Sequence, residues 1–294
     1  MGQGHGWEGA VLKLLRGKDF VLTVTGAEQV TEHYRRIHVT DGGMLAATGV
    51  HPTMWVRLWF DAAGKPHQRA YTLVDPDPAA GTFSLEFALH DGHASDWARA
   101  AKPGDTIEAT VQGTAFSDPD PAPSHLLVIG DPASLPAINS LLTALPSAPA
   151  TIWFETPSTD TGPTLEARAS GPVGAARTTG SGTKADAGPD GGPGPDSGPG
   201  RESGSGPGAV TGTEGLPFRV DPSRHDVRPI SRQDAGARLI AQVKADAPAL
   251  LTATPDPYVW IACDTATTRS LTAHFRKELG LPKQRIHALG YWRP

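Results

Sequence analysis

Short alternating segments dominate the first third of the chain. In residues 82–90, Phe83, Leu85 and Phe87 alternate with polar or small residues, which is the period of a strand that buries one face. Similar segments are rich in β-branched and aromatic residues, and glycine and proline separate them. We therefore expect strands over residues 21–25, 34–40, 54–60, 69–74, 82–90 and 106–111. Several short strands at this spacing predict a small antiparallel β-barrel.

The second half of the chain alternates between strand and helix patterns. Residues 126–129 form a continuous apolar run, typical of a parallel strand that is covered on both faces. Ser134 and Pro136 then mark a helix start, and residues 150–155 and 258–262 are expected to be further strands. Apolar stripes with helical spacing follow at Ala235, Leu239, Ile240 and Val243 and at Leu271, Phe275 and Leu279. This alternation predicts a parallel-sheet α/β nucleotide-binding domain.

A segment of low complexity interrupts the second pattern. Residues 157–216 are dominated by Gly, Pro, Ser, Thr and Asp and have almost no large apolar side chains. They cannot bury enough surface to offset an ordering entropy of about 1 to 2 kcal/mol per residue, so we expect a disordered insertion. The predicted domains are a β-barrel over residues 15–120 and an α/β domain built from residues 121–156 and 217–294.

The run Arg69-Ala70-Tyr71-Thr72 has the side chains that hold a flavin. On a strand, Arg69 and Tyr71 share one face, while Thr72 points to the other and brings its backbone alongside. A guanidinium grips a pyrophosphate with two parallel hydrogen bonds, a phenol ring lies against an isoalloxazine plane, and a threonine hydroxyl or amide reaches a ring nitrogen. Arginine and tyrosine two apart on a strand are also common surface residues, so this interpretation needs support from elsewhere in the chain.

A predicted helix start offers a second part of the same site. Ala94 and Ser95 begin a helix that extends to about residue 101, just after a turn that contains Gly92. Free backbone amides and the positive end of the helix dipole then lie where a flavin pyrophosphate binds, and His90 and Gly92 shape the approach. Ser95 acting as a plain N-cap is the alternative.

Strand ends in the second domain offer a nucleotide site. Gly130 and Asp131 lie at the carboxyl edge of the first parallel strand, where open α/β sheets bind ligands, although this strand end has no Gly-x-Gly-x-x-Gly motif. Asp264 and Thr265 follow another strand and are candidates to flank a nicotinamide. Equally, Thr265 could cap the helix that follows.

The last residues contain an aromatic pair, Tyr291 and Trp292. We place this pair near the cleft of the nucleotide-binding domain. The alternative is that both side chains only seal the domain.

Four separated motifs carry a family resemblance. They are Arg69-Ala70-Tyr71-Thr72; Phe87-Ala88-Leu89-His90-Asp91-Gly92 with Ala94-Ser95-Asp96-Trp97-Ala98 and Lys102-Pro103-Gly104-Asp105; Leu127-Val128-Ile129-Gly130-Asp131 with Leu135-Pro136-Ala137-Ile138; and Gly290-Tyr291-Trp292-Arg293. In order and spacing they resemble the siderophore-interacting protein family of ferric-siderophore reductases, within the ferredoxin-reductase-like flavoproteins. The resemblance covers residues 10–155 and 230–294 and implies an FAD-binding barrel, an NAD(P)H-binding domain and electron transfer from NAD(P)H through FAD to a ferric siderophore. The implied cofactor-binding residues are Arg69, Ala70, Tyr71, Thr72, His90, Gly92, Ala94, Ser95, Gly130, Asp131, Asp264, Thr265, Tyr291 and Trp292.

Departures from the family pattern keep other functions open. Val74 lies near the position where the family often has a second basic residue. His93 stands where the family usually has a Gly-Pro pair, and Cys263-Asp264 stands where it has a Gly-Glu pair. One alternative is a non-enzymatic siderophore- or flavin-binding protein with a degenerate nicotinamide site. Another is a flavin reductase for a different acceptor, such as a quinone or an electron-transfer protein.

Composition and charge narrow the remaining classes of function. The 294 residues carry 26 basic and 31 acidic side chains, a net charge of -5, which gives no global basic footprint for nucleic acid. No apolar run approaches the length of a membrane span, so we expect no membrane insertion. No apolar h-region follows the first basic residues, so we expect a cytoplasmic protein. We also expect a monomer. A single cysteine and irregularly spaced histidines predict no resident metal. The cofactor would perform the chemistry, so no side-chain acid or nucleophile is assigned, and iron would belong to the substrate.

Overall fold

The computed structural model describes residues 17–62, 64–157, 213 and 215–293. The predicted insertion at 157–216 lies almost wholly outside these residues. No helix in the described part of the chain is both long and apolar enough to cross a membrane.

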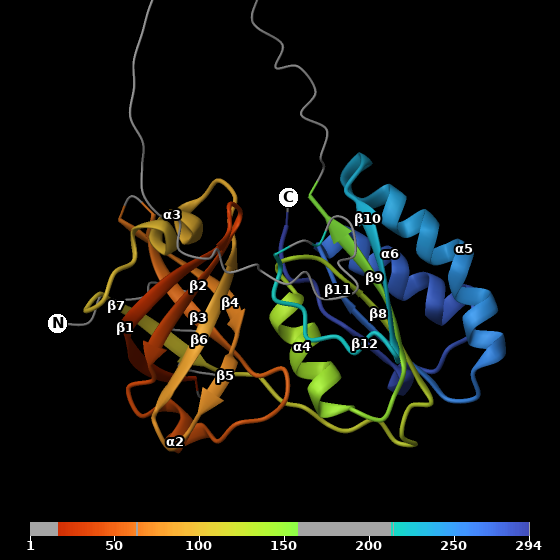
Figure 1. Cartoon of the computed structure of the whole chain (residues 1–294), viewed down its shortest axis with the longest axis horizontal. Helices are drawn as coiled ribbons and strands as arrows, with labels where there is room; N and C mark the ends of the chain where they lie inside the picture. Colours follow the sequence, from red (N-terminus) through yellow and green to blue (C-terminus); the bar gives the residue numbers. More distant parts are fainter. Residues whose placement is uncertain (1–16, 63, 158–212, 214, 294) are drawn as a thin grey trace, which may run out of the picture. The chain divides into compact units, whose positions relative to one another are not determined.

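Seven strands build the antiparallel sheet of the first part, in the order β4-β3-β7-β1-β2-β6-β5 (Figure 1). Their bounds are β1 Lys18–Thr31, β2 Tyr34–Thr40, β3 Trp55–Ala62, β4 Lys65–Thr72, β5 Val74–Asp77, β6 Thr82–Ala88 and β7 Thr106–Val111. The long strand β1 pairs with both β2 and β7 and contains two register shifts against β2. Such shifts bend and twist a strand, which curves the sheet into the barrel predicted from the sequence.

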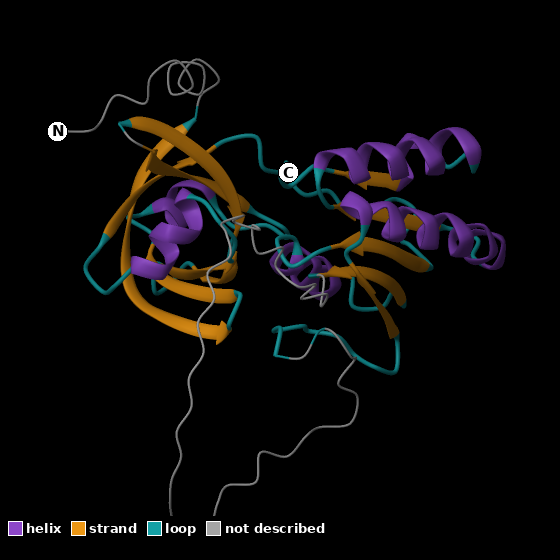
Figure 2. Cartoon of the chain, turned by 90° about the horizontal axis from the view of Figure 1, so that it is seen from above, coloured by secondary structure: helices purple, strands orange, loops and turns teal. Residues whose placement is uncertain are grey.

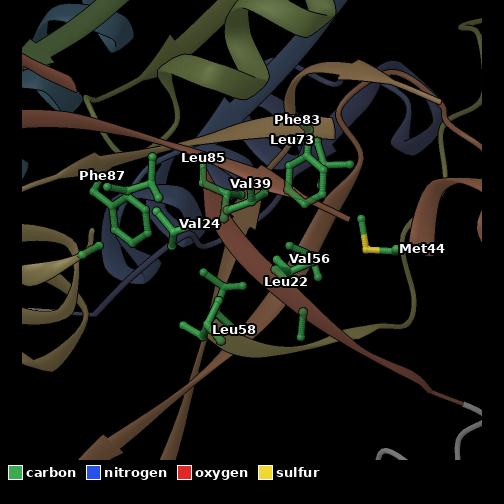
Figure 3. Packing of buried hydrophobic residues seen from close by; sticks show 14 of the residues in the cluster. Leu22, Val24, Val39, Met44, Val56, Leu58, Leu73, Phe83, Leu85 and Phe87 are labelled. Atoms are coloured by element: carbon green, nitrogen blue, oxygen red, sulfur yellow. The ribbon is translucent and has the colours of Figure 1, made fainter. Parts of the chain in front are cut away.

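The inner face of this sheet is a closely packed apolar core. Alternate residues of each strand point inward, among them Leu22 and Val24 on β1 and Leu85 and Phe87 on β6, and all of these side chains are buried (Figure 3). Two short helices complete the barrel, α2 (Met44–Thr48) and α3 (His93–Ala100). Trp97 of α3 packs against the barrel core, so α3 is fixed to the sheet by an apolar contact.

Five parallel strands form the second sheet, in the order β10-β9-β8-β11-β12. The strands are β8 His125–Gly130, β9 Ala150–Thr156, β10 His225–Ser231, β11 Pro257–Ala262 and β12 Ile286–Ala288. The helices are α4 Leu135–Ala144, α5 Ala237–Ala253 and α6 Thr265–Ala273, with short turns η1 Asp234–Gly236, η2 His274–Glu278 and η3 Lys283–Arg285.

Helices cover both faces of the parallel sheet (Figure 2). Leu126 and Val128 of β8 join the cluster that contains α4, whereas Leu127 and Ile129 join the cluster that contains α5 and α6. Because successive side chains of a strand point to opposite faces, this division accounts for the continuous apolar run of β8. The α/β architecture predicted from that run is confirmed.

The sequence patterns missed both edge strands of the parallel sheet, β10 and the three-residue β12. Strand β10 lies at the edge of the sheet and pairs with β9 on one side. An edge strand is less enclosed than a central one, so its sequence need not be a continuous apolar run. Charged residues and Pro229 interrupt its sequence, and an edge strand tolerates both. The second predicted helical stripe is also broken, because α6 ends at Ala273 and continues as the π-helical turn η2.

Candidate functional site

Strand β4 presents Arg69 to solvent. The Arg69 side chain is exposed, and its Nη1 donates to the backbone carbonyl of Gln68 at 2.8 Å. None of the described carboxylates forms an ion pair with this guanidinium. Its other N–H groups are therefore available to an external anion.

Aromatic rings hold Tyr71 from the barrel side. The Tyr71 ring centroid lies 4.3 Å from that of Phe87 and 6.3 Å from that of Phe60, and Trp97 packs against both phenylalanines. Burial raises the pKa of Tyr71, so its phenol stays neutral. The half-buried ring is thus a rigid, uncharged surface beside Arg69.

Helix α3 begins at His93, before the predicted start at Ala94 and Ser95. Gly92 is the N-cap with φ 139°, a conformation that favours glycine, and no side chain caps the helix. The first backbone N–H groups of α3 therefore have no partner within the helix. Ser95 is only 2% exposed, and its Oγ accepts from the backbone N–H of His90 at 3.1 Å. Ser95 thus braces the preceding loop, and the alternative in which it is a plain N-cap is wrong.

Two stacked imidazoles join β4 to the start of α3. The ring centroids of His67 and His93 lie 6.0 Å apart with an interplanar angle of 29°. His67 is two residues from Arg69, so both side chains leave the same face of β4. The stack consequently brings the first residue of α3 to the face that presents Arg69, and the two parts of the predicted pyrophosphate site are neighbours.

A buried aspartate closes the turn after β8. A Cβ at Gly130 would lie 2.5 Å from Ser134 Oγ, so the close approach of the helix requires glycine there. Asp131 is 3% exposed and accepts from the backbone N–H groups of Ala133 (3.0 Å) and Ser134 (3.2 Å) and from Trp292 Nε1 (2.7 Å). Burial raises the pKa of Asp131 to about 6. Asp131 therefore organises the turn and the C-terminal tryptophan from inside the protein.

Asp264 caps the helix that follows β11. Its Oδ1 accepts from the backbone N–H groups of Ala266 (2.9 Å) and Thr267 (3.0 Å), and its Oδ2 accepts from the Thr267 hydroxyl (2.7 Å). Thr265 is the first residue of α6, and its N–H and hydroxyl both donate to the carbonyl of Trp292, at 2.9 and 3.0 Å. The alternative in which Thr265 is the cap is wrong, because Asp264 has that role.

Two charged residues of the same sheet edge were not predicted. Glu155, the penultimate residue of β9, is 3% exposed and forms an ion pair with Arg232, which follows β10. Arg232 also lies 3.6 Å from Asp264 Oδ2 and stacks over the Trp292 ring at 4.8 Å. Burial raises the pKa of Glu155, whose Oε1 has no hydrogen-bond partner in this structure. A charged residue near the end of an apolar strand was a usable signal for Glu155, whereas Arg232 follows β10, which the patterns missed.

The last residues of the chain cross the carboxyl ends of β8 and β11. Trp292 forms a parallel bridge with Asp264, and the Tyr291 N–H donates to the carbonyl of Cys263 at 2.8 Å. The hydroxyl groups of Tyr291 and Thr72 are hydrogen-bond partners. The Thr72 hydroxyl, predicted to reach a flavin nitrogen, therefore contacts the C-terminal tyrosine. Cys263 is fully buried and burial raises the pKa of its thiol.

A cavity of about 660 Å³ lies beside α3. Trp59, Phe60 and Trp97 contribute aromatic surface to it, and His93 is on its border. A second cavity, of about 310 Å³, includes Arg219 in its lining. His93, the first residue of α3, places the larger cavity next to the predicted pyrophosphate site, but Arg69 and Ser95 do not line it.

Two family models match this chain. The model of the siderophore-interacting FAD-binding domain matches residues 41–113, and the model of the siderophore-interacting protein matches residues 216–294. Together these matches cover about half of the chain. The first contains Arg69, Tyr71 and the start of α3, and the second contains Asp264 and Trp292.

Individual proteins extend the comparison. The mycobactin import ATP-binding/permease protein IrtA of Mycobacterium tuberculosis is 27% identical over 98% of this chain and 28% of its own length. A solved siderophore-interacting protein of Acinetobacter baumannii is 17% identical with a TM-score of 0.64, over 94% of this chain and 91% of that one. A ferredoxin NADP+ reductase of Neisseria gonorrhoeae, solved with FAD and NADP, is 12% identical with a TM-score of 0.58, over 94% of this chain and 99% of that one. The chain spans less than a third of the length of the curated mycobactin import proteins it matches. The solved structures establish a ferredoxin-reductase-like fold.

Proposed function

Because the chain belongs to the siderophore-interacting protein family, we propose that it is a flavoprotein reductase that passes electrons from NAD(P)H through FAD to a ferric siderophore. The family's FAD-binding domain is present in the barrel. One observation carries the proposal: the His67–His93 stack places the uncapped start of α3 beside the face of β4 that presents Arg69.

The residues at this place fit the diphosphate of FAD. Arg69 has donors free for an anion, and the first amides of α3 lack partners in the helix. Tyr71 would offer its ring to the isoalloxazine while Phe87 holds that ring in place. Bound FAD would supply the redox chemistry, which is acceptance of two electrons as a hydride and their delivery one at a time.

We assign NAD(P)H to the carboxyl edge of the parallel sheet. Gly130 allows close approach of α4, and ligands of open α/β sheets bind outside this edge. Tyr291 and Trp292 lie across the same edge, so they would border the nicotinamide. In the balanced reaction, one NAD(P)H reduces two Fe(III) ions to Fe(II) and releases one proton. Reduction weakens the hold of hard oxygen donors on iron, and the metal then leaves the siderophore.

A mycobactin-type siderophore is the first acceptor to test. Three of the curated relatives are named as mycobactin import proteins. The chain matches only part of each of them, so their transport activity is not carried over. A flavin reductase for a different acceptor stays an alternative, because no described residue distinguishes the acceptors.

A second candidate function is non-enzymatic binding of flavin or siderophore. Its support is the acidic character of the presumed nucleotide edge, where Asp131, Glu155 and Asp264 are all buried and, among the described residues, Arg232 forms ion pairs with Glu155 and Asp264. These carboxylates would repel the phosphates of a nucleotide. The two candidates differ in whether NAD(P)H reduces the bound flavin.

The deciding experiment is an absorbance spectrum of the FAD-loaded protein before and after anaerobic addition of NADH or NADPH. The reductase bleaches with one of them and regains its colour when a ferric siderophore is added, with Fe(II) captured by a chelator. A flavin that stays yellow with both nucleotides would support the binding protein. Bleaching followed by no Fe(II) release would support reduction of another acceptor.

A further inference from the structure

One buried oxygen at the carboxyl edge of the parallel sheet has no hydrogen-bond partner among the described residues. The side chains of Asp131, Glu155 and Asp264 are buried there, and every carboxylate oxygen of the three accepts a hydrogen bond except Oε1 of Glu155. A buried acceptor that lacks a partner lowers the stability of the folded protein. A ligand that donates a hydrogen bond to this oxygen would satisfy it.

The place of Glu155 in the sheet indicates which part of a nucleotide supplies that donor. Strand β9 lies beside β8 in parallel register and Phe154 pairs with Gly130, so Glu155 stands one residue beyond the level of the first strand end. In open α/β sheets that bind dinucleotides, the diphosphate lies at the turn after the first strand. An acidic residue further along the chain then accepts a hydrogen bond from the 2′-hydroxyl of a ribose. Glu155, on the second strand of this sheet, is placed for that contact.

The arginine beside Glu155 is already engaged within the protein. Arg232 donates to Oε2 of Glu155 and lies 3.6 Å from Oδ2 of Asp264. Its guanidinium also stacks over the ring of Trp292 at 4.8 Å. The positive charge of Arg232 therefore offsets the carboxylates of the protein. A phosphate brought to Glu155 would meet an acceptor where it needs a donor, and the neighbouring carboxylates would repel it.

We propose that Glu155 accepts a hydrogen bond from the 2′-hydroxyl of the adenosine ribose and so selects NADH over NADPH as the electron donor. This inference rests on the proposed function, because it specifies the nucleotide that the reductase uses. NADPH carries a phosphate on this ribose oxygen, so it has no hydroxyl to donate there and brings more negative charge to an acidic edge. A site built around one hydroxyl rejects an analogue that lacks it, because the polar group of the protein is then left without a partner.

A strained connection between β10 and α5 covers the free oxygen. The backbone of Gly236 lies against it, since a Cβ added there would be 3.6 Å from Oε1 of Glu155. The two preceding residues, Asp234 and Ala235, have φ values of 46° and 52°, which residues other than glycine rarely adopt. Displacement of this connection by the ribose would relieve the strain and open Oε1 to the ligand.

The test compares two fragments that differ only at the ribose. AMP carries the free 2′-hydroxyl and 2′-phospho-AMP does not, and each is titrated calorimetrically into the FAD-loaded full chain. Wild type should bind AMP about ten- to a hundredfold more tightly, which is the range for one hydrogen bond to a charged group. Anaerobic bleaching of the flavin should likewise reach half of its maximal rate at a lower concentration of NADH than of NADPH.

Two substitutions of Glu155 separate the acceptor from the charge. Glu155→Ser removes the carboxylate and releases Arg232, so the preference for AMP should fall by about tenfold or more. Glu155→Gln keeps an acceptor oxygen and removes the charge, so AMP binding should persist while the discrimination narrows; it also serves if the serine variant does not fold. The matched control is Asp226→Asn, which changes an exposed, arginine-paired carboxylate at the amino end of β10 and should leave the ratio unchanged.

The outcomes distinguish this inference from the proposed function. Equal affinities of wild type for the two fragments, or an unchanged ratio in both Glu155 variants, would overturn the role of Glu155 and leave the reductase assignment intact. A wild-type preference for NADPH that Arg238→Gln abolishes would also overturn it, and would assign the 2′-phosphate to this exposed arginine in the first turn of α5. A flavin that neither NADH nor NADPH bleaches would overturn the proposed function itself.

Discussion

The start of α3 and the carboxyl edge of the parallel sheet are built in opposite ways. Around α3, Arg69, His67 and His93 are exposed and keep donors free of described partners. At the sheet edge, Asp131 and Asp264 are buried and their oxygens accept several protein donors. The exposed polar groups near α3 are available for a ligand, whereas the buried carboxylates at the sheet edge are already hydrogen-bonded within the protein.

This difference predicts where each kind of substitution is felt. Unpartnered surface groups contribute little to folding, so their loss should appear in ligand affinity. Removal of one member of a buried charged network leaves the others uncompensated, so that loss should appear in the free energy of unfolding. The two regions are therefore distinguished by comparing affinity and stability for the same variants.

The largest effect is expected from Arg232→Met. Arg232 is the cation that compensates Glu155 and Asp264, whose side chains are 3% and 1% exposed. Loss of a partner from a buried pair costs about 3 to 5 kcal/mol, which chemical denaturation would report as a lower free energy of unfolding. Arg99→Met is the control, because it removes an arginine from the exposed pair with Asp96 and should cost less than about 1 kcal/mol. Equal losses in the two variants would show that the sheet-edge network does not stabilise the fold.

A pH-dependent effect is expected from Asp131→Asn. The folded-state pKa of Asp131 is about 6, above its ordinary value of 3.8, so the folded protein takes up a proton at a higher pH than the unfolded chain does. Ionisation of Asp131 thus opposes folding, and its contribution to the unfolding free energy falls by up to about 3 kcal/mol as pH rises from about 4 to about 6. Asparagine does not titrate, so the variant should gain stability relative to wild type over this interval.

Denaturation curves at about pH 4 and about pH 7 would measure that gain. The matched control is Asp96→Asn, which changes an exposed carboxylate of α3. If the wild type and Asp131→Asn differ by the same amount at both pH values, Asp131 does not ionise in the way its burial requires.

Local sequence patterns were sufficient to predict most of the strands and helices. Alternation in residues 82–90 predicted β6, and the apolar run 126–129 predicted β8, because burial on one face or on two leaves a direct period in the sequence. Strand β10 was missed since an edge strand has no such requirement. The start of α3 was placed too late because Ser95 has the chemistry of a cap but is used by the backbone of the preceding loop.

The candidate site was predictable only in part. Residues that belong to a compact motif, such as Arg69 and Tyr71, could be proposed from adjacent positions in one strand. The pairings of Arg232 with Glu155 and of His67 with His93 join residues far apart in the sequence. Such contacts depend on strand order and helix placement, which no local pattern contains. The cofactor-binding roles assigned to individual residues stay predictions, as do the domain boundaries.

A loss of affinity without a loss of stability is expected from Arg69→Ala. Arg69 is exposed and bonded within the protein only to the Gln68 carbonyl. Loss of a bidentate, charge-assisted contact with a pyrophosphate would cost about 1.5 to 3 kcal/mol, which is about ten- to a hundredfold in the Kd for FAD. Arg69→Lys keeps the charge without the planar fork and should lie between alanine and wild type. An unchanged Kd in the alanine variant would remove Arg69 from the cofactor site.

The smallest effect is expected where the two regions are linked, between Thr72 of β4 and Tyr291 of the C-terminal segment. Their hydroxyls are hydrogen-bond partners, and Thr72 is 5% exposed. Burial raises the pKa of Tyr291, so its phenol stays neutral and the bond joins two uncharged groups. A neutral bond of this kind contributes about 1 kcal/mol, and Tyr291→Phe should lose about that much by leaving the Thr72 hydroxyl unsatisfied. Thr72→Val in the same chain removes the orphaned hydroxyl, so the double variant should be more stable than the sum of the single losses predicts. A double-mutant cycle in urea measures this coupling, and a coupling free energy near zero would mean that the flavin motif and the C-terminal segment are energetically independent.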